Sequence, residues 1–322
     1  MKHRPRRNRK SPSIRELIAE THIKTSDLIY PLFIIDGINK KIPIDSMPNC
    51  FRWSLDVLLK EIENCGKFGF QNFVLFPAIE DQLKDKEASY SYDPNNFYLK
   101  AINNIKKQFP EFTLMSDVAM DPYSSDGHDG YVNDGEIIND ISLPILSKMA
   151  VAQAEAGIDI IGPSDMMDGR VQHIREKLDK NGFNKTSIMS YTAKYASAFY
   201  GPFGDALDSA PKSGDKKTYQ MDPRNQTEAL IEAELDQEEG ADFLMVKPAL
   251  SYLDVICLLK QHTFLPVAAY NVSGEYSMIH AASQKGWLDY ESSFIEVLTS
   301  IKRAGADIIL TYFAKDFAKI IN

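Results

Sequence analysis

The stretch "EAGIDIIGPS" (155–164) is typical of a helix that ends and passes directly into a buried strand. The same pattern returns in "EGADFLMVKPA" (239–249) and "RAGADIILTYFA" (303–314). In each segment a glycine, which can take the left-handed conformation, closes a helical stretch. An aspartate follows two residues later and an unbroken apolar run comes next, which is typical of strands buried on both faces. "FGFQNFVLFPA" (68–78) is a looser fourth case.

Eight apolar runs of this kind occur along the chain, and helical patterns separate most of them. Eight strands that alternate with helices predict a (β/α)8 TIM barrel, whose active site lies at the carboxyl ends of the strands. An open doubly wound sheet is the main rival, but no GxGxxG motif opens any of these helices. The expected strands are 28–35, 73–77, 112–118, 158–164, 187–191, 243–248, 265–272 and 307–313.

The composition is that of a soluble globular protein. At 322 residues, with 44% hydrophobic and 25% charged residues, the chain has ample material for a core. No apolar run approaches the roughly 18 residues of a membrane-spanning helix, so we expect no membrane partner. The cysteines Cys50, Cys65 and Cys257 show neither CxxC nor disulfide-framework spacing, which fits a reducing compartment. We therefore expect a cytoplasmic protein.

The net charge of −9 hides an asymmetry. "MKHRPRRNRK" (1–10) carries six lysines and arginines, which leaves 30 basic against 45 acidic residues in the rest of the chain. A basic head can be a nucleic-acid arm or a targeting peptide, but no signal-type apolar segment follows it, and Glu16 and Glu20 oppose a transit peptide. We interpret residues 1–25 as an oligomerisation arm that lies on the acidic surface of a second copy, and 26–322 as the catalytic barrel. No nucleic-acid partner is expected.

Two lysines occur at the ends of apolar strands. Lys194 ends "SIMSYTAK" and Lys247 ends "FLMVK". One such lysine is ordinary, because its stem can lie on the core while the ammonium reaches water. Two of them in one barrel mouth repel each other and are desolvated, and both effects lower a lysine pKa. A neutral amine attacks ketones and aldehydes, so the pair predicts Schiff-base chemistry on two carbonyl substrates.

Other strand ends add polar groups to the same mouth. Singly, each serine is more often a cap or turn residue, but as a ring these groups predict a pocket for carboxylates. The long connection 200–225, rich in Gly, Pro, Ser and charge, is typical of an active-site lid or of a plain surface loop. The polar residues are Ser116, Asp117, Ser164, Asp165, Ser273 and Tyr312.

The loop "DVAMDPYSSDGHDG" (117–130) holds four aspartates and His128. Acids this close repel each other, so they need hydrogen bonds, basic partners or a hard cation. Magnesium accepts one or two carboxylates and keeps several waters, so a cation site is as compatible with the loop as satisfaction by backbone donors and lysines. Both interpretations stay open. The possible active-site acids are Asp117, Asp121 and Asp129.

Five segments together resemble the porphobilinogen synthase family, also called the 5-aminolevulinate dehydratase family. The resemblance keeps its order from about the basic head to the C-terminus. The combination of two lysine motifs with serine and tyrosine motifs makes it specific. The segments are "MSYTAKYASAFYGPF", "GDKKTYQMDP", "GADFLMVKPA", "AAYNVSGEYSM" and "DLIYPLFI".

The resemblance implies a barrel whose N-terminal arm embraces a neighbour, usually in a homo-octamer. It implies condensation of two 5-aminolevulinate molecules to porphobilinogen with loss of two waters, early in tetrapyrrole synthesis and without an organic cofactor. Lys247 would hold the substrate that becomes the propionate side, and Lys194 the one that becomes the acetate side. By motif match, Ser273 and Tyr312 bind the first substrate's carboxylate, and Lys216 in the lid binds the second's.

Three further positions bear on what the resemblance implies. Glu232 matches the acid of the family's magnesium site near subunit contacts, so we expect a structural or allosteric magnesium there. Gly204 stands where the family usually has an arginine that binds the second carboxylate, and Lys212 or Lys217 are candidate substitutes. Zinc-dependent members place three cysteines in the acidic loop. Here those positions are Ala119, Asp121 and Asp129, and aspartates suit hard cations better than zinc, so we expect a non-zinc, aspartate-loop type.

Three alternatives remain at this stage. A class I aldolase-type barrel also uses a strand-end lysine, but it would need only one, and the lid and second lysine oppose it. A binding protein could use the basic head to hold nucleic acid electrostatically. The third alternative is a barrel of the same family with impaired activity, and Gly204 is the one feature that favours it.

Overall fold

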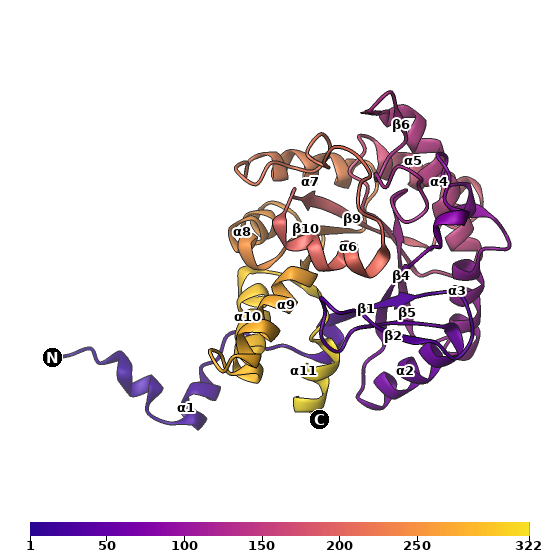
Figure 1. Cartoon of the computed structure of the whole chain (residues 1–322). Helices are drawn as coiled ribbons and strands as arrows, with labels where there is room; N and C mark the ends of the chain where they lie inside the picture. The colour runs from indigo at the N-terminus through magenta and orange to yellow at the C-terminus, as the bar shows by residue number, and fades with distance from the viewer. Residues whose placement is uncertain (322) are drawn as a thin grey trace.

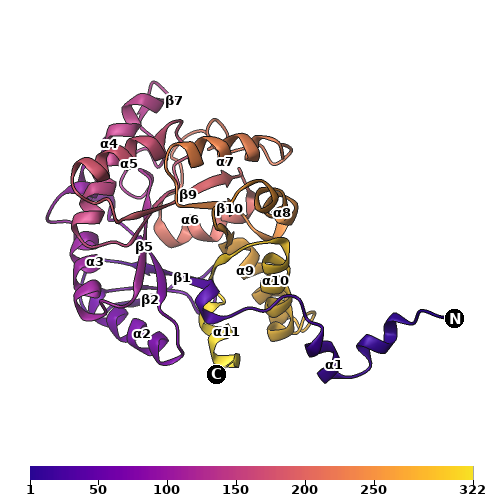
Figure 2. The same cartoon turned by 180° about the vertical axis from the view of Figure 1, so that it is seen from behind.

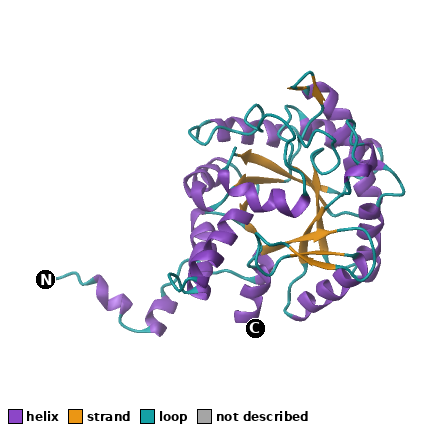
Figure 3. Cartoon of the chain, in the orientation of Figure 1, coloured by secondary structure: helices purple, strands orange, loops and turns teal. Residues whose placement is uncertain are grey.

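The computed structural model, which describes residues 1–321, contains a closed barrel of eight parallel strands surrounded by helices (Figures 1 and 3). Each expected apolar run overlaps one barrel strand, although β9 extends three residues beyond its expected end, so the predicted (β/α)8 fold is confirmed. The last strand pairs back with the first, which closes the sheet. In barrel order the strands are β1 (Leu28–Ile34), β4 (Asn72–Pro77), β5 (Thr113–Val118), β8 (Ile160–Pro163), β9 (Ser187–Lys194), β10 (Phe243–Lys247), β11 (Val267–Asn271) and β12 (Ile308–Thr311).

Helices connect consecutive strands and form the outer layer, as the two opposite views show (Figures 1 and 2). The connection from β11 to β12 carries two helices, and one helix follows β12. The helices of this layer are α2 (Leu55–Lys67), α3 (Phe97–Gln108), α4 (Asn139–Glu155), α5 (Arg170–Lys180), α7 (Glu228–Glu238), α8 (Leu253–His262), α9 (Ser273–Gln284), α10 (Tyr290–Ala304) and α11 (Ala314–Ile321). Short 3-10 helices are η1 (Pro5–Arg9), η2 (Thr25–Asp27), η3 (Asp81–Leu83), η4 (Ser89–Tyr92), η5 (Ala198–Tyr200) and η6 (Leu250–Tyr252).

The repeated helix-to-strand joint has the predicted geometry. Gly157, Gly240 and Gly305 have φ angles of 103°, 100° and 122°. Gly69, in the looser fourth case, has a φ of 69°. Only glycine takes such angles without strain from a Cβ atom, so each of these residues lets the chain leave its helix and enter the barrel directly.

The aspartate of each joint connects two neighbouring strands. The side chain of Asp242, just before β10, accepts a hydrogen bond of 2.7 Å from the backbone N–H of Ile188 on β9. Asp159 accepts one of 2.8 Å from Leu114 on β5, and Asp307 one of 2.8 Å from Val267 on β11. The backbone N–H of the same aspartate donates to the carbonyl of the same partner each time. The repeated Gly-x-Asp pattern is therefore a strand-pairing device at the amino ends of the strands.

Two small antiparallel ribbons were not predicted. In the first, β2 (Lys41–Pro43) pairs with β3 (Phe51–Trp53), and β3 also runs parallel to β1. In the second, β6 (Val132–Asn133) pairs with β7 (Glu136–Ile137). Strands of two or three residues, exposed or half-buried, carry no alternation long enough to detect from sequence.

The sequence predicted an irregular connection over residues 200–225, but part of this segment is helical. Its first part forms helix α6 (Gly201–Leu207), with a proline in the first turn, where the missing N–H needs no partner. Phe203 on α6 packs against Phe33 and Phe76, with ring centroids 5.8 Å and 5.0 Å apart. Helix α6 therefore lies over the ends of β1 and β4, at the catalytic face of the barrel.

The first residues of the chain extend away from the barrel (Figures 1 and 2). Neither η1 nor α1 (Pro12–Leu17) contains a buried residue. Within residues 1–321 no helix combines the length and apolarity that crossing a bilayer requires.

We predict that Asp242→Ala lowers the free energy of unfolding by about 1 kcal/mol, because the N–H of the buried residue Ile188 loses its acceptor. Asp242→Asn keeps an acceptor oxygen and should retain most of the stability. Urea unfolding of both variants measures the difference. Equal destabilisation by the two substitutions would contradict the hydrogen-bonding role.

Candidate active site

The two strand-end lysines lie side by side on adjacent strands. Lys194 is the last residue of β9 and Lys247 the last of β10, and the register pairs them directly. Both residues are buried, with 6% of their surface exposed. A single cavity of about 680 Å³ includes both in its lining. Two amines thus reach one solvent-accessible cavity from neighbouring strand ends.

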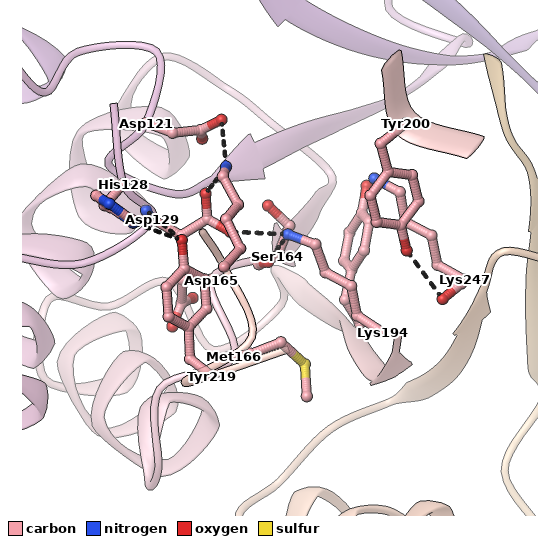
Figure 4. A network of polar contacts seen from close by, with 12 residues as sticks. Asp121, His128, Asp129, Ser164, Asp165, Met166, Lys194, Tyr200, Tyr219 and Lys247 are labelled. Atoms are coloured by element: carbon pink, nitrogen blue, oxygen red, sulfur yellow. Dashed lines mark hydrogen bonds and ion pairs between the residues drawn. The ribbon is translucent and has the colours of Figure 1, made fainter. Parts of the chain in front are cut away.

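Lys194 is held as an ion pair. Its Nζ lies 3.0 Å from Oδ2 of Asp129, and it also donates to the backbone carbonyl of Ser164. Figure 4 shows its ammonium between these oxygens on one side and the Tyr200–Lys247 pair on the other. Asp129 is fully buried, so this contact is shielded from solvent.

Lys247 lies in an aromatic cage. Its Nζ is 4.8 to 5.2 Å from the ring centroids of Tyr191, Tyr200, Phe203 and Tyr270. Burial, together with the charge of the neighbouring Lys194, lowers the pKa of Lys247 to about 7, although nearby aspartates oppose the shift. The rings attract a cation, but they replace few of the hydrogen bonds that water gives an ammonium. Lys247 is therefore an amine that is neutral in a large fraction near pH 7.

Asp129 also binds a third lysine, which comes from the lid. Oδ1 of Asp129 lies 2.5 Å from Nζ of Lys216, and Oδ2 of Asp121 lies 3.2 Å from the same nitrogen. Burial by itself raises the pKa of Asp129, but Lys194 and Lys216 outweigh it and hold that pKa well below its usual range. Ser209 donates to Asp121 as well. Lysines and a hydroxyl thus satisfy these two loop acids.

Two other acids near the lysines are poorly neutralised. Burial raises the pKa of Asp117 to about 6, and Asp121 adds to the shift. Burial likewise raises the pKa of Asp165 to about 7. One Asp165 oxygen accepts a hydrogen bond from the backbone of Met167, and the other has no partner. Both carboxyl groups can hold a proton near neutral pH, the condition that acid–base catalysis needs.

A chain of hydrogen bonds fastens the lid to the acidic loop (Figure 4). Nε2 of His128 lies 2.9 Å from the carbonyl of Ser213, an acceptor, so that nitrogen carries the proton. Nδ1 then accepts from the hydroxyl of Tyr219, 3.2 Å away. The same hydroxyl accepts from the backbone N–H of Asp129. These contacts attach the segment predicted as a lid to the acidic loop on both sides of Lys216.

The structure places the remaining predicted residues at three locations. Tyr312 contacts the cage indirectly, because its hydroxyl is 3.0 Å from that of Tyr270. Ser273, buried at the start of α9, donates to the carbonyl of Phe199. Neither Tyr312 nor Ser273 lines the 680 Å³ cavity that contains the lysines. Glu232 lies on α7 and lines a separate cavity of about 710 Å³.

Sequence reasoning missed the cage and the lid contacts. Tyr200 and Phe203 stand in the quoted lid segment, but aromatic residues there are equally typical of core packing. Tyr191 and Tyr270 lie inside barrel strands and were counted only as apolar residues. His128 was noted in the acidic loop, whereas its partner Tyr219 is 91 positions away. No local pattern links residues so far apart.

Comparisons with known proteins identify the relatives of this chain. Residues 2–320 match the family model for delta-aminolevulinic acid dehydratase. The enzyme of that name from Chlamydia pneumoniae is 55% identical over 322 residues, covering 100% of this chain and 97% of the relative. The Bacillus subtilis (strain 168) enzyme is 51% identical, covering 98% of this chain and 97% of the relative.

A solved structure agrees with this result. The Toxoplasma gondii ME49 delta-aminolevulinic acid dehydratase (porphobilinogen synthase), in complex with the reaction product porphobilinogen, has a TM-score of 0.97 and 51% identity. The match covers 99% of this chain and 92% of that one. With its closed barrel and two adjacent buried lysines, the chain belongs to the delta-aminolevulinic acid dehydratase family.

Proposed function

We propose that this protein is a porphobilinogen synthase, a lyase that condenses two molecules of 5-aminolevulinate to porphobilinogen with loss of two waters. The observation that carries the proposal is the pair Lys194 and Lys247, whose amines meet in one cavity from directly paired strand ends. Identities of 51% to 55% with relatives of this name support it.

Lys247 takes the first substrate. A neutral amine adds to the ketone of 5-aminolevulinate, and loss of water gives a Schiff base. The aromatic cage keeps the nitrogen dry, and burial gives Lys247 a pKa near 7, so the reactive form is present without a strong base. The hydroxyl of Tyr312, through Tyr270, and the buried hydroxyl of Ser273 are the groups we assign to its carboxylate.

Lys194 takes the second substrate after its ion pair with Asp129 opens. An ammonium has no lone pair for attack, so the proton must leave before a Schiff base forms. We propose that the acids near it, Asp117 and Asp165, carry protons during these steps, since burial raises the pKa of both toward neutrality. Lys216 is assigned to the second carboxylate, which must compete with Asp121 and Asp129.

A class I aldolase-type barrel is the weaker alternative. A single Schiff base would leave the second buried lysine without a role. Burying the ammonium of Lys194 beside Asp129 carries an unfavourable desolvation free energy. A lysine with no function would not offset that free energy. The paired lysines therefore favour a reaction with two carbonyl substrates.

We propose that this chain is a non-zinc, aspartate-loop member of the family. Catalysis would then use no zinc ion at the acidic loop. Ala119 has no donor atom, and the carboxylates of Asp121 and Asp129 are engaged by Lys194, Lys216 and Ser209. Among residues 1–321, no group of three or more His, Cys, Asp or Glu side chains is arranged to hold a metal. Thiolates would be the donors that zinc prefers.

We propose a magnesium ion at Glu232, outside the active site. Burial raises the pKa of Glu232 to about 7 although Arg170 opposes the shift, and Asp236, Asp168 and Glu228 raise it further. A divalent cation would offset this excess of negative charge. Magnesium commonly keeps several waters and takes one or two carboxylates, so one glutamate in a polar cavity fits it. Its charge would act on α7 and not on the substrates.

We propose that residues 1–25 join this chain to further copies in a homo-octamer. Neither η1 nor α1 buries a residue on its own chain, and Leu17 and Ile18 are exposed. The basic residues of 1–10 complement the acidic remainder of the chain. An exposed helix of six residues is not stable alone, which favours a partner surface.

We predict that borohydride in the presence of 5-aminolevulinate traps a covalent adduct on Lys247 first, and on Lys194 at higher substrate concentration. The amine in the cage is partly neutral, whereas the other is paired with Asp129. Peptide mapping by mass spectrometry locates the adducts. Adducts on neither lysine would overturn the mechanism, and Lys247→Ala should abolish turnover while the fold persists.

The same trapping experiment should depend on pH in a defined direction. Because the pKa of Lys247 is about 7, its neutral fraction grows as the pH rises through 7 and falls about tenfold per unit well below it. The initial trapping rate at Lys247 should follow that curve. A rate that stays flat between pH 6 and pH 8 would contradict the lowered pKa.

We predict that Gly204→Arg lowers the half-saturating concentration of the second substrate. A Cβ atom at Gly204 meets nothing within 4 Å, and the position lines the active-site cavity. A guanidinium grips a carboxylate with charge-assisted hydrogen bonds worth roughly 1.5–3 kcal/mol before the cost of ordering the lid. Gly204→Ala is the control, because it adds helix propensity to α6 without adding charge. Unchanged affinity in the arginine variant would mean that its guanidinium does not reach the second carboxylate.

We predict that magnesium stimulates the chelator-treated enzyme and that Glu232→Ala loses this response. Glu234→Ala, on the same helix but in a different cavity, should keep it. Activity and magnesium-dependent thermal stabilisation are both measured. Restoration by zinc alone, or activity untouched by chelation, would refute the assignment.

A further inference from the structure

We infer that Lys217, whose ion-pair partner Asp215 is exposed to solvent, supplies the positive charge that binds the carboxylate of the second substrate, in the space beside Gly204. The inference rests on the proposed function, which brings two carboxylate-bearing molecules into one cavity. Lys217 is adjacent to Lys216 in the connection 200–225.

The charges that line the cavity leave little attraction for an anion. Four lysines line it, at positions 194, 216, 217 and 247. Five aspartates line it as well, at positions 117, 121, 205, 208 and 215. A carboxylate entering this space meets more acids than bases. It therefore needs a cation that is not already neutralised by a buried partner.

Three of the four lysines are committed elsewhere. Lys194 is paired with buried Asp129, and Lys247 lies in the aromatic cage as the amine that attacks the first substrate. Lys216 is shared between Asp121 and Asp129 at 3.2 and 2.5 Å. These pairs are largely shielded from water, so a substrate that breaks one must replace most of its energy.

Lys217 differs because its partner is exposed. Its Nζ lies 2.8 Å from Oδ2 of Asp215, with side-chain exposures of 75% and 55%. Such exposed surface pairs contribute little to stability, so an entering carboxylate exchanges with Asp215 at low cost. Lys217 lines both this cavity and the cavity that contains Glu232, and its long, flexible stem lets the ammonium turn toward the lysine-lined one.

The geometry separates Lys217 from the other candidate, Lys212. Lys217 and Gly204 line the same cavity, whereas Lys212 does not line it. The backbone N–H of Lys212 donates to the carbonyl of Asp126, which fixes that part of the lid to the acidic loop. The region around Gly204 on α6 is open, with nothing within 4 Å of a Cβ built there. A carboxylate bound by Lys217 has room to lie against this wall.

The test compares Lys217→Ala, Lys217→Arg and Lys212→Ala in the full-length enzyme. Rates of porphobilinogen formation are measured against 5-aminolevulinate concentration, and borohydride adducts are counted on Lys247 and Lys194. We expect Lys217→Ala to raise the half-saturating concentration about fivefold to tenfold, the effect of losing one charge-assisted contact at a partly exposed site. Trapping on Lys247 at low substrate should stay unchanged, while trapping on Lys194 weakens. Lys217→Arg should behave like the wild type.

Two further results decide the inference. Lys212→Ala should match the wild type, and Gly204→Arg added to Lys217→Ala should restore the affinity, because a cation on the facing wall replaces the lost one. A half-saturating concentration for Lys217→Ala within twofold of the wild type, or an equal effect of Lys212→Ala, would overturn the role of Lys217 alone. A wild type that forms no porphobilinogen would overturn the proposed function with it.

Discussion

The carboxylate of Asp129, buried between two ammonium groups, is the interaction on which the closed active site depends. It binds Lys194 of the barrel at 3.0 Å and Lys216 of the lid at 2.5 Å. A fully buried carboxylate without partners is strongly unfavourable, and removing one partner of such a pair typically costs about 3–5 kcal/mol. The barrel and the lid therefore share one neutralising contact. Opening the lid leaves Asp129 with a single lysine partner, so lid position and the charge on Lys194 are physically linked.

The same barrel geometry gives the two lysines opposite chemistry. Their register makes them neighbours, so strand pairing alone would treat them alike. The difference arises from what covers them. Lys194 receives oxygens from Asp129 and Ser164, whereas four aromatic rings surround Lys247. A fall of the Lys247 pKa from 10.5 to about 7 corresponds to roughly 5 kcal/mol of lost preference for the ammonium. The same burial that disfavours the ammonium makes Lys247 a reactive neutral amine.

How well the sequence predicts each contact depends on how many positions separate the two partners along the chain. The barrel follows from a local pattern, because glycine, aspartate and an apolar run lie within ten residues at three of its joints, and apolar runs mark the other strands. The lysines follow from their place at the ends of those runs. The pairing of Asp129 with Lys194 and Lys216 spans 65 and 87 positions, and no local pattern specifies it. Likewise, the cage combines residues of β9, β11 and the lid. The helical start of the lid was missed because glycine and proline usually mark loops, although a proline in the first turn suits a helix.

Under the proposed site assignment, these contacts require the substrates to bind by exchange and not by simple addition. The buried cations of the cavity already have partners within the chain, and the aspartates that line it outnumber the lysines. A carboxylate that reaches Lys216 must displace Asp121 or Asp129, and the displaced acid then needs a proton or another donor. Asp117 has a pKa raised to about 6 by burial in the same wall, so protons can be held there while charges rearrange. The lid lysines, the loop aspartates and the strand-end amines therefore behave as one electrostatic unit, in which moving any charge changes the reactivity of the others.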